Sequence, residues 1–400
     1  MGPLDGLRVV EVALLAPNML GMHLADLGAD VIKVEDPGRG DYTRSVGAAR
    51  AGGLSFLHLR WNRGKRSMVV DLRTEAGAQV FRDLVASSEV VIEGMRRGAL
   101  ERRDLGYASL SARQPSLVFC SLSGFGQTGP YRDLASHGVA YDAFAGHASP
   151  ETTDEGFVTI PRHYSDIGTQ AGALYATMGV LAAVLHARAT GEGAYIDVAQ
   201  ADAAVVWNAS RLDPLLSGAA SGSQGAGLRE SVRYQYYVTA DDRTILFQAS
   251  EQHFFEAFCH AVGRDDLAQR PGADVGEHAS GDKELRRELT AIFVTKTQAE
   301  WMRLFLEVDV PGGPVNSVAG LLDDPQFLAR AQHVEQEHPE AGHLTLLGSP
   351  IHLEISSAAS SAAPVLPAPA QGAHTDEVLR SVLGYQDDHI AALRDHGVIA

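Results

Sequence analysis

Short apolar runs, rich in β-branched residues, alternate with segments of helical spacing through the first 125 residues. The runs cover residues 7–13, 30–36, 67–72, 89–94 and 116–124, and helices are expected over about residues 20–29 and 75–86. Strands joined by single helices pair in parallel, because the helix carries the chain back across the sheet. The pattern predicts a doubly wound, Rossmann-like α/β domain, with ligands at the carboxyl ends of its strands.

Basic residues recur beside the ends of these expected strands. One group precedes residue 67 and a second follows residue 94; the members are Arg63, Lys65 and Arg66, then Arg96, Arg97, Arg102 and Arg103. Because the whole chain has a net charge of −17, such local clusters indicate a phosphate-bearing ligand, which the planar guanidinium suits well. A merely solvated surface is the alternative. The same net charge argues against a general nucleic-acid or anionic-membrane binder.

A glycine-rich stretch, GFGQTG at residues 124–129, follows the last of these strands. It fits the dinucleotide pattern G-x-G-x-x-G, but Pro130, Tyr131 and Arg132 come next, where that fingerprint requires an apolar helix. The stretch therefore predicts a turn near a ligand and not a nicotinamide site.

A long apolar segment from Gly168 to about Arg188 predicts a helix ended by Gly191. Its apolar positions fall on most faces, so the helix should be buried. Asp166 stands at the helix start, where free N–H groups and the helix dipole favour a negative charge. An ordinary N-cap is the alternative, because Asp is a common cap. His137 precedes it in a Gly/Ala-rich loop and is a candidate partner, although most such histidines are structural.

Beyond residue 210 the composition changes. Residues 211–230 form a Ser/Gly-rich linker, and residues 231–330 predict a smaller α+β domain that opens with a hairpin around residues 240–242. Residues 356–370 predict an extended connector before two short terminal helices. Two cysteines, no secretory signal and an apolar run at residues 173–185 that is too short to span a bilayer together predict a cytoplasmic protein.

Several segments, in this order, carry a resemblance to a known family: GLRVVEVA, LADLGADVIKVEDPGRGD, NRGKRSMVVDL, SGFGQTGP, TGEGAYIDV and GAHTDEVL. Together the chain resembles the family III CoA-transferases, the carnitine/bile-acid-inducible (CaiB/BaiF-type) group that includes the 2-methylacyl-CoA racemases. The resemblance implies an interlocked homodimer whose large domain comes from residues 1–210 and 331–400. It also implies an acyl-CoA substrate, which supplies the coenzyme A, and no metal or redox cofactor.

The resemblance further implies a set of site residues. Asp166 matches the aspartate essential in both branches of the family, whereas His137 and Glu251 match the racemases and differ from the usual transferase residues. The expected CoA-binding residues are Lys33, Arg63, Leu72, Arg96, Arg102, Gly124 and Gly126.

Three functions follow as hypotheses. The leading one is epimerisation at the carbon α to a thioester, with His137 and Asp166 as the acid–base pair and Glu251 orienting the imidazole. The alternative is CoA transfer through an aspartyl-CoA thioester on Asp166; the sequence Ile167-Gly168-Thr169 in place of the racemases' glycine run, and the residues 221–227, SGSQGAG, favour it. The third is a CoA-binding homologue without activity. No motif marks the acyl group.

Overall fold

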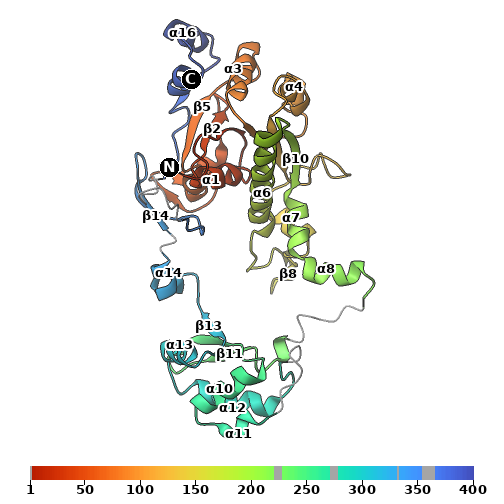
Figure 1. Cartoon of the computed structure of the whole chain (residues 1–400), viewed down its shortest axis with the longest axis vertical. Coiled ribbons are helices and arrows are strands. Elements are labelled where there is room, and N and C mark those ends of the chain that lie inside the picture. The colour runs from red at the N-terminus through yellow and green to blue at the C-terminus, as the bar shows by residue number, and fades with distance from the viewer. Residues whose placement is uncertain (1, 220–227, 271–277, 331–332, 354–364) are drawn as a thin grey trace. The chain divides into compact units, whose positions relative to one another are not determined.

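The chain forms two compact units, drawn in Figure 1. The computed structural model describes residues 2–219, 228–270, 278–330, 333–353 and 365–400. The large unit comprises residues 1–209 and 332–400, and the small unit comprises residues 210–331. The two ends of the sequence therefore belong to the same unit.

A six-stranded sheet, parallel throughout, is the centre of the large unit. Its order is β10-β7-β6-β1-β2-β5. The strands are β1 (Arg8–Val12), β2 (Asp30–Glu35), β5 (Lys65–Val69), β6 (Val90–Glu93), β7 (Val118–Ser123) and β10 (Ala194–Ala199). The order reverses between β1 and β6, as in doubly wound dinucleotide-binding folds. The prediction of a parallel α/β domain is confirmed.

Helices cover both faces of this sheet. On one face lie α3 (Glu75–Ala86), α4 (Tyr107–Ser111), α15 (Thr375–Ser381) and α16 (Asp387–Asp395); on the other lie α1 (Asn18–Asp26), α2 (Phe56–Trp61) and α6 (Ile167–Thr190). Successive strand residues supply the two cores, since Val10 packs with the first set and Val9 with the second. Burial on both faces explains why the strands are continuous apolar runs.

Helix α6 has two different sides. One side packs on α1, β7 and α7 (Gln200–Trp207), and Figure 1 shows α6 beside α7 and β10. The other side exposes Leu174, Met178 and Leu185, at 44%, 56% and 71%. The expectation of a buried helix is therefore met on one side only in the single chain, because nothing in the described residues packs on the other side. By length and composition alone, α6 is also the one described helix that could span a bilayer. It is longer than the apolar run at residues 173–185, from which the sequence predicted no membrane span.

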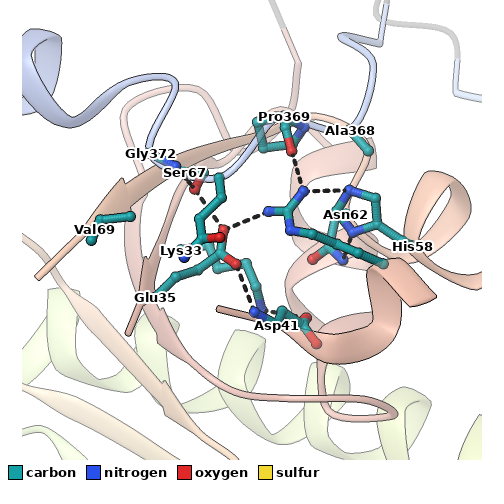
Figure 2. A network of polar contacts seen from close by, with 12 residues as sticks. Lys33, Glu35, Asp41, His58, Asn62, Ser67, Val69, Ala368, Pro369 and Gly372 are labelled. Carbon is teal, nitrogen blue, oxygen red and sulfur yellow. Dashed lines mark hydrogen bonds and ion pairs between the residues drawn. The ribbon is translucent and has the colours of Figure 1, made fainter. Parts of the chain in front are cut away.

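The C-terminal segment is bound to residues from the start of the chain, as Figure 2 shows. Arg44 donates to the carbonyl of Pro369 at 2.9 Å, and Gly372 N–H donates to Ser67 Oγ at 2.8 Å. The part of the chain that follows the small unit also contains an antiparallel hairpin that the sequence did not reveal. It is formed by β14 (His333–His338) and β15 (Gly342–Leu347). The large unit is therefore complete only when both ends of the chain are present.

Short elements join the main ones in the large unit. They are η1 (Tyr42–Ser45), β3 (Arg50–Ala51), β4 (Leu54–Ser55), η2 (Glu101–Arg103), α5 (Val139–Phe144), β8 (Glu151–Thr152), β9 (Val158–Thr159) and, running into the small unit, α8 (Ala209–Leu216). Two of them, η1 and α5, carry residues of the site described below.

The small unit has an antiparallel sheet in the order β11-β12-β13. Its elements are β11 (Gln235–Val238), β12 (Thr244–Phe247), α10 (Gln252–Ala261), α11 (Asp265–Ala268), α12 (Lys283–Phe293), α13 (Gln298–Glu307), β13 (Gly312–Val315), η3 (Gly320–Asp323) and α14 (Pro325–Ala329). The predicted hairpin is present, whereas β13 was not predicted. Residues 220–227 of the predicted linker and residues 356–364 of the predicted connector lie outside the described residues, whereas residues 211–216 of the linker belong to α8.

Candidate active site

Two cavities open where the parallel strands end. The larger has a volume of about 1120 Å³ and the smaller about 260 Å³. They adjoin, because Leu14, Met95 and Arg102 line both. Leu14 follows β1 and Met95 follows β6, so the cavities lie at the reversal of strand order, where doubly wound folds bind their ligands.

Two arginines that were predicted to bind CoA place their positively charged side chains at these cavities. Arg102 lines both cavities and Arg96 lines the larger one, and both side chains are exposed. Among the ion pairs of the described residues, neither arginine has a carboxylate partner. Leu72 lines the smaller cavity with Arg102. An apolar side chain beside unpaired guanidinium groups suits a ligand that combines a flat ring with phosphates.

Two other predicted CoA-binding residues do not face a ligand, and this corrects the expectation. Lys33 is fully buried, and its Nζ lies 3.2 Å from Glu11, 3.0 Å from Asp41 and 2.7 Å from the carbonyl of Ala13. Arg63 is equally buried, with Nε donating to Asp26 at 2.9 Å. A buried cation needs paired acceptors. Both positive charges are paired with carboxylates inside the protein and are not available to a phosphate.

The buried network around Lys33 instead shapes the loop that leads into the larger cavity (Figure 2). Burial alone would raise the pKa of Asp41, but the Lys33 ammonium and the N–H of Thr43 hold that pKa well below its usual range. The ionised Asp41 caps η1 by accepting from Thr43 N–H at 2.9 Å. Tyr42 in this turn lines the larger cavity. Lys33 therefore acts on the site through the backbone that it fixes.

Asp166 lies at the N-cap position of α6, yet its side chain makes no capping hydrogen bond. Its Oδ1 is buried without a hydrogen-bond partner, and the residue lines the larger cavity. Burial raises the pKa of Asp166; the nearby Thr169 hydroxyl opposes this effect in part, and the charge of Asp142 adds a smaller increase. The interpretation of Asp166 as an ordinary cap is therefore wrong. A carboxylate left without partners in a cavity is available for chemistry.

The capping function belongs to Asp142 on α5, which sequence reasoning missed. Its Oδ1 accepts a hydrogen bond from Gly168 N–H at 2.9 Å. The side chain is fully buried, and burial raises its pKa. In the sequence, Asp142 is only an acidic residue in an amphipathic stretch, so no local signal separates it from a solvated one.

His137 lines the same cavity as Asp166. The backbone that follows it lies beside the carboxylate, because a Cβ built on Gly138 would lie 3.7 Å from Asp166 Oδ1. The histidine is exposed in the single chain. The structure thus brings the predicted pair into one cavity, with the backbone after the histidine beside the carboxylate.

The two predicted glycines have different positions. Gly124 lines the larger cavity, and a Cβ there would lie 2.3 Å from Ser136 Oγ, so only glycine lets the loop that carries His137 approach. Gly126 adopts φ +80° in the turn that follows and is not a lining residue of that cavity. The turn is held by Gln127 N–H, which donates to Asp197 at 3.0 Å.

Glu251 lies in the small unit, at the N-cap of α10, and its side chain makes no capping hydrogen bond. Its predicted role beside the imidazole of His137 stays a prediction.

A doubly wound α/β fold, with a partnerless carboxylate at a helix start and a cleft edged by arginines, defines an enzyme for a phosphate-bearing substrate. The sequence profile of CoA-transferase family III matches residues 4–375. The chain therefore belongs to the family III CoA-transferases, enzymes that act on acyl-CoA.

Relatives agree over nearly full length. A succinate–glutarate CoA-transferase from Agrobacterium fabrum is 33% identical over 94% of this chain and 95% of its own. A succinyl-CoA–D-citramalate CoA-transferase from Chloroflexus aurantiacus is 31% identical, over 99% and 98%. The crystal structure of a CaiB/BaiF family protein from Brucella suis superposes with a TM-score of 0.74 at 29% identity, covering 95% of this chain and 99% of that one. The relatives from Agrobacterium fabrum and Chloroflexus aurantiacus carry transferase names, which favour the transferase alternative over the leading racemase hypothesis.

Proposed function

We propose that this enzyme moves coenzyme A from an acyl-CoA to a carboxylic acid, with Asp166 as the nucleophile. The observation that carries the proposal is the Asp166 carboxylate itself, half-buried at the mouth of α6, with Oδ1 unpartnered and the residue lining the larger cavity. Its neighbour Asp142 accepts the hydrogen bond from Gly168 N–H at the helix start, so this N–H does not occupy the nucleophile. A carboxylate freed from hydrogen bonds is a stronger nucleophile than a solvated one.

The transfer proceeds by exchange of acyl bonds. The Asp166 oxygen attacks the thioester carbonyl, and the carbon–sulfur bond breaks to give a mixed anhydride and the CoA thiolate. The thiolate attacks the aspartyl carbonyl, which releases the donor acid and leaves an aspartyl-CoA thioester. An acceptor carboxylate then repeats the two steps in reverse. No electron transfer occurs, so no redox cofactor or metal is required.

We propose a short dicarboxylic acid as the acceptor. The acyl group of the donor is then derived from a short dicarboxylic acid as well. The names of the two relatives, with succinate, glutarate and citramalate, support this class. Arg132 lines the larger cavity, and its guanidinium is about half exposed. A cation there is suited to hold the distal carboxylate of such an acid.

A homodimer in the cytoplasm is the proposed setting, with the two chains interlocked as family resemblance implies. The exposed apolar side chains on α6, Leu174, Met178 and Leu185, support a partner surface, as does Trp207 at 56% exposure. Light scattering on the purified protein tests this; a monomer at micromolar concentration contradicts it.

Trapping of the covalent intermediate tests the reaction. The enzyme is mixed with succinyl-CoA and then treated with hydroxylamine or borohydride. After digestion, mass spectrometry measures the mass of the peptide that contains Asp166. We expect a modification of Asp166 that requires acyl-CoA, transfer of CoA to glutarate, and neither in Asp166→Asn. Transfer that persists in Asp166→Asn would show that the nucleophile is wrongly assigned.

Racemisation is the second candidate, favoured by the presence of His137 in the cavity of Asp166. Two bases on opposite faces of an α-carbon would exchange its hydrogen with solvent. A single-epimer 2-methylacyl-CoA incubated in D₂O would then acquire deuterium at the α-carbon. Exchange without any adduct on Asp166 would establish this function in place of transfer.

A further inference from the structure

Partnerless buried polar atoms gather in one place. Among the described residues, twelve buried side-chain nitrogen or oxygen atoms lack a hydrogen-bond partner. Five of them belong to residues that line the larger cavity: Ser123, Gln127, Asp166, Thr169 and Gln200. Buried polar groups are nearly always paired. Their concentration at one cavity marks the surface at which a ligand supplies the missing partners.

Two of these residues flank the nucleophile. Thr169 follows Asp166 by three residues, so both side chains lie on the same side of the first turn of α6. Gln200 begins α7 and is pressed onto this turn, because a Cβ on Gly172 would lie 2.8 Å from its Cγ and one on Gly168 would lie 3.0 Å from its carbonyl oxygen. Thr169 is 2% exposed and Gln200 is 3% exposed. Their polar atoms are therefore fixed before a ligand arrives.

We propose that the Thr169 hydroxyl and the Gln200 amide donate hydrogen bonds to the aspartyl carbonyl oxygen while the aspartyl-CoA thioester forms and breaks. This inference rests on the proposed transfer through Asp166. The CoA thiolate adds to Cγ of the aspartyl anhydride, and the carbonyl electron pair moves onto the oxygen. That pair then returns and expels the donor acid as its carboxylate. The unpartnered amide atom of Gln200 is Oε1, and a half-turn about the Cγ–Cδ bond places Nε2 at that position while the rest of the side chain stays in place.

Charge explains why donors are needed at this oxygen. The tetrahedral state places a full negative charge beside Asp142, whose carboxylate is fixed on Gly168 N–H at 2.9 Å. Fixed donors aimed at a developing oxyanion lower the barrier without reorganisation. Neutral donors suit this place, because a cation would bind the free Asp166 carboxylate and quench its nucleophilicity.

Thr169→Val tests the proposal, with Thr169→Ser as the conservative variant and Gln200→Met as the second donor removed. Thr177→Val is the matched control, because its hydroxyl is used within α6, donating to the Ala173 carbonyl at 2.7 Å. The rate of adduct formation with succinyl-CoA is measured by rapid quench and protein mass. We expect a decrease of about ten- to a hundredfold for Thr169→Val and Gln200→Met, recovery in Thr169→Ser, and KM values within about twofold of wild type.

Stability separates this role from a structural one. Thr169→Val removes a buried hydroxyl that has no partner, so its melting temperature should equal or exceed that of the wild type. An adduct rate equal to that of Thr177→Val overturns the proposal, and so does a raised KM for the acceptor with an unchanged adduct rate. Absence of any adduct in the wild type would instead overturn transfer through Asp166. The proposed role of Thr169 and Gln200 would then be rejected as well.

Discussion

Asp142 accepts a hydrogen bond from the backbone N–H of Gly168 at 2.9 Å, although Asp166 occupies the N-cap position of the same helix. Two carboxylates thus divide the functions that one usually performs. Asp142 satisfies the helix start, and Asp166 is left for the substrate. The arrangement keeps two negative charges close together, which raises the pKa of Asp166 in addition to the effect of burial.

Asp142→Asn should extend activity to lower pH. The amide oxygen can still accept from Gly168, but the charge that raises the pKa of Asp166 is gone. Because Asp166 attacks as the carboxylate, activity falls as the pH drops through its pKa, and a lower pKa moves this fall to more acidic pH. The pH dependence of kcat/KM measures the shift, with exposed Asp154→Asn as the control. A shift toward higher pH would contradict the assignment.

Arg102→Gln should weaken CoA binding more than turnover. This guanidinium lines both cavities and has no carboxylate partner among the described residues, so its removal deletes a charged contact to ligand alone. We expect KM for acyl-CoA to rise about tenfold, with kcat within about threefold. Arg113→Gln, at the end of α4 and outside both cavities, should leave KM unchanged. Equal effects of the two variants would refute the phosphate-binding role.

Lys33→Met should destabilise the large unit. It leaves the buried Asp41 carboxylate without its cation, although Glu11 keeps Lys65 at 2.8 Å, and breaking a buried pair costs about 3–5 kcal/mol. Arg8→Met, which removes a partly exposed pair with Asp30, should cost ~1 kcal/mol or less. Urea unfolding of both variants gives the comparison. Weakened CoA binding in a Lys33 variant of unchanged stability would restore the ligand role first expected.

Glu93 should make the stability of the protein depend on pH. It lies at the end of β6, where it accepts from Ser121 Oγ at 2.8 Å and from Met95 N–H at 3.0 Å. Burial raises its pKa from 4.5 to about 7. The folded state therefore holds this proton more tightly, and its contribution to stability is lost as the pH rises from about 4.5 through 7.

Glu93→Gln imitates the protonated side chain and should remove this loss. Relative to the variant, wild type should lose up to ~3 kcal/mol between pH 4.5 and 8. Urea unfolding of both proteins across this range measures the difference. A constant difference would show that Glu93 does not titrate there.

Sequence reasoning was most successful where a single segment decides its own structure. The sheet strands are buried on both faces and so appear as apolar runs, and α6 ends at Gly191, which adopts φ +79°. The hairpin β14–β15 escaped notice because HVEQEH alternates charged with partly buried residues and lacks an apolar signature.

The failures concern side chains whose partners are distant in sequence. Lys33 meets Glu11 across 22 residues and Arg63 meets Asp26 across 37, so a cation near a strand end could not be distinguished from one that awaits a phosphate. Asp142 was overlooked for the same reason, since it caps a helix 26 residues away. The sequence left the reaction open because His137 and an aspartate can serve proton transfer or accompany acyl transfer equally well.

The contacts of Arg44 with Pro369 and of Ser67 with Gly372 join residues 325 and 305 positions apart. During synthesis, the early half of the chain leaves the ribosome long before its closing segment exists. Strand β5 is an outer strand of the sheet, and Ile399 beyond α16 bridges to Val70 beside it. Until that segment is made, this side of the sheet is an unprotected edge. A stop codon ahead of Pro369 would therefore release a polypeptide that keeps this edge exposed and is prone to aggregate.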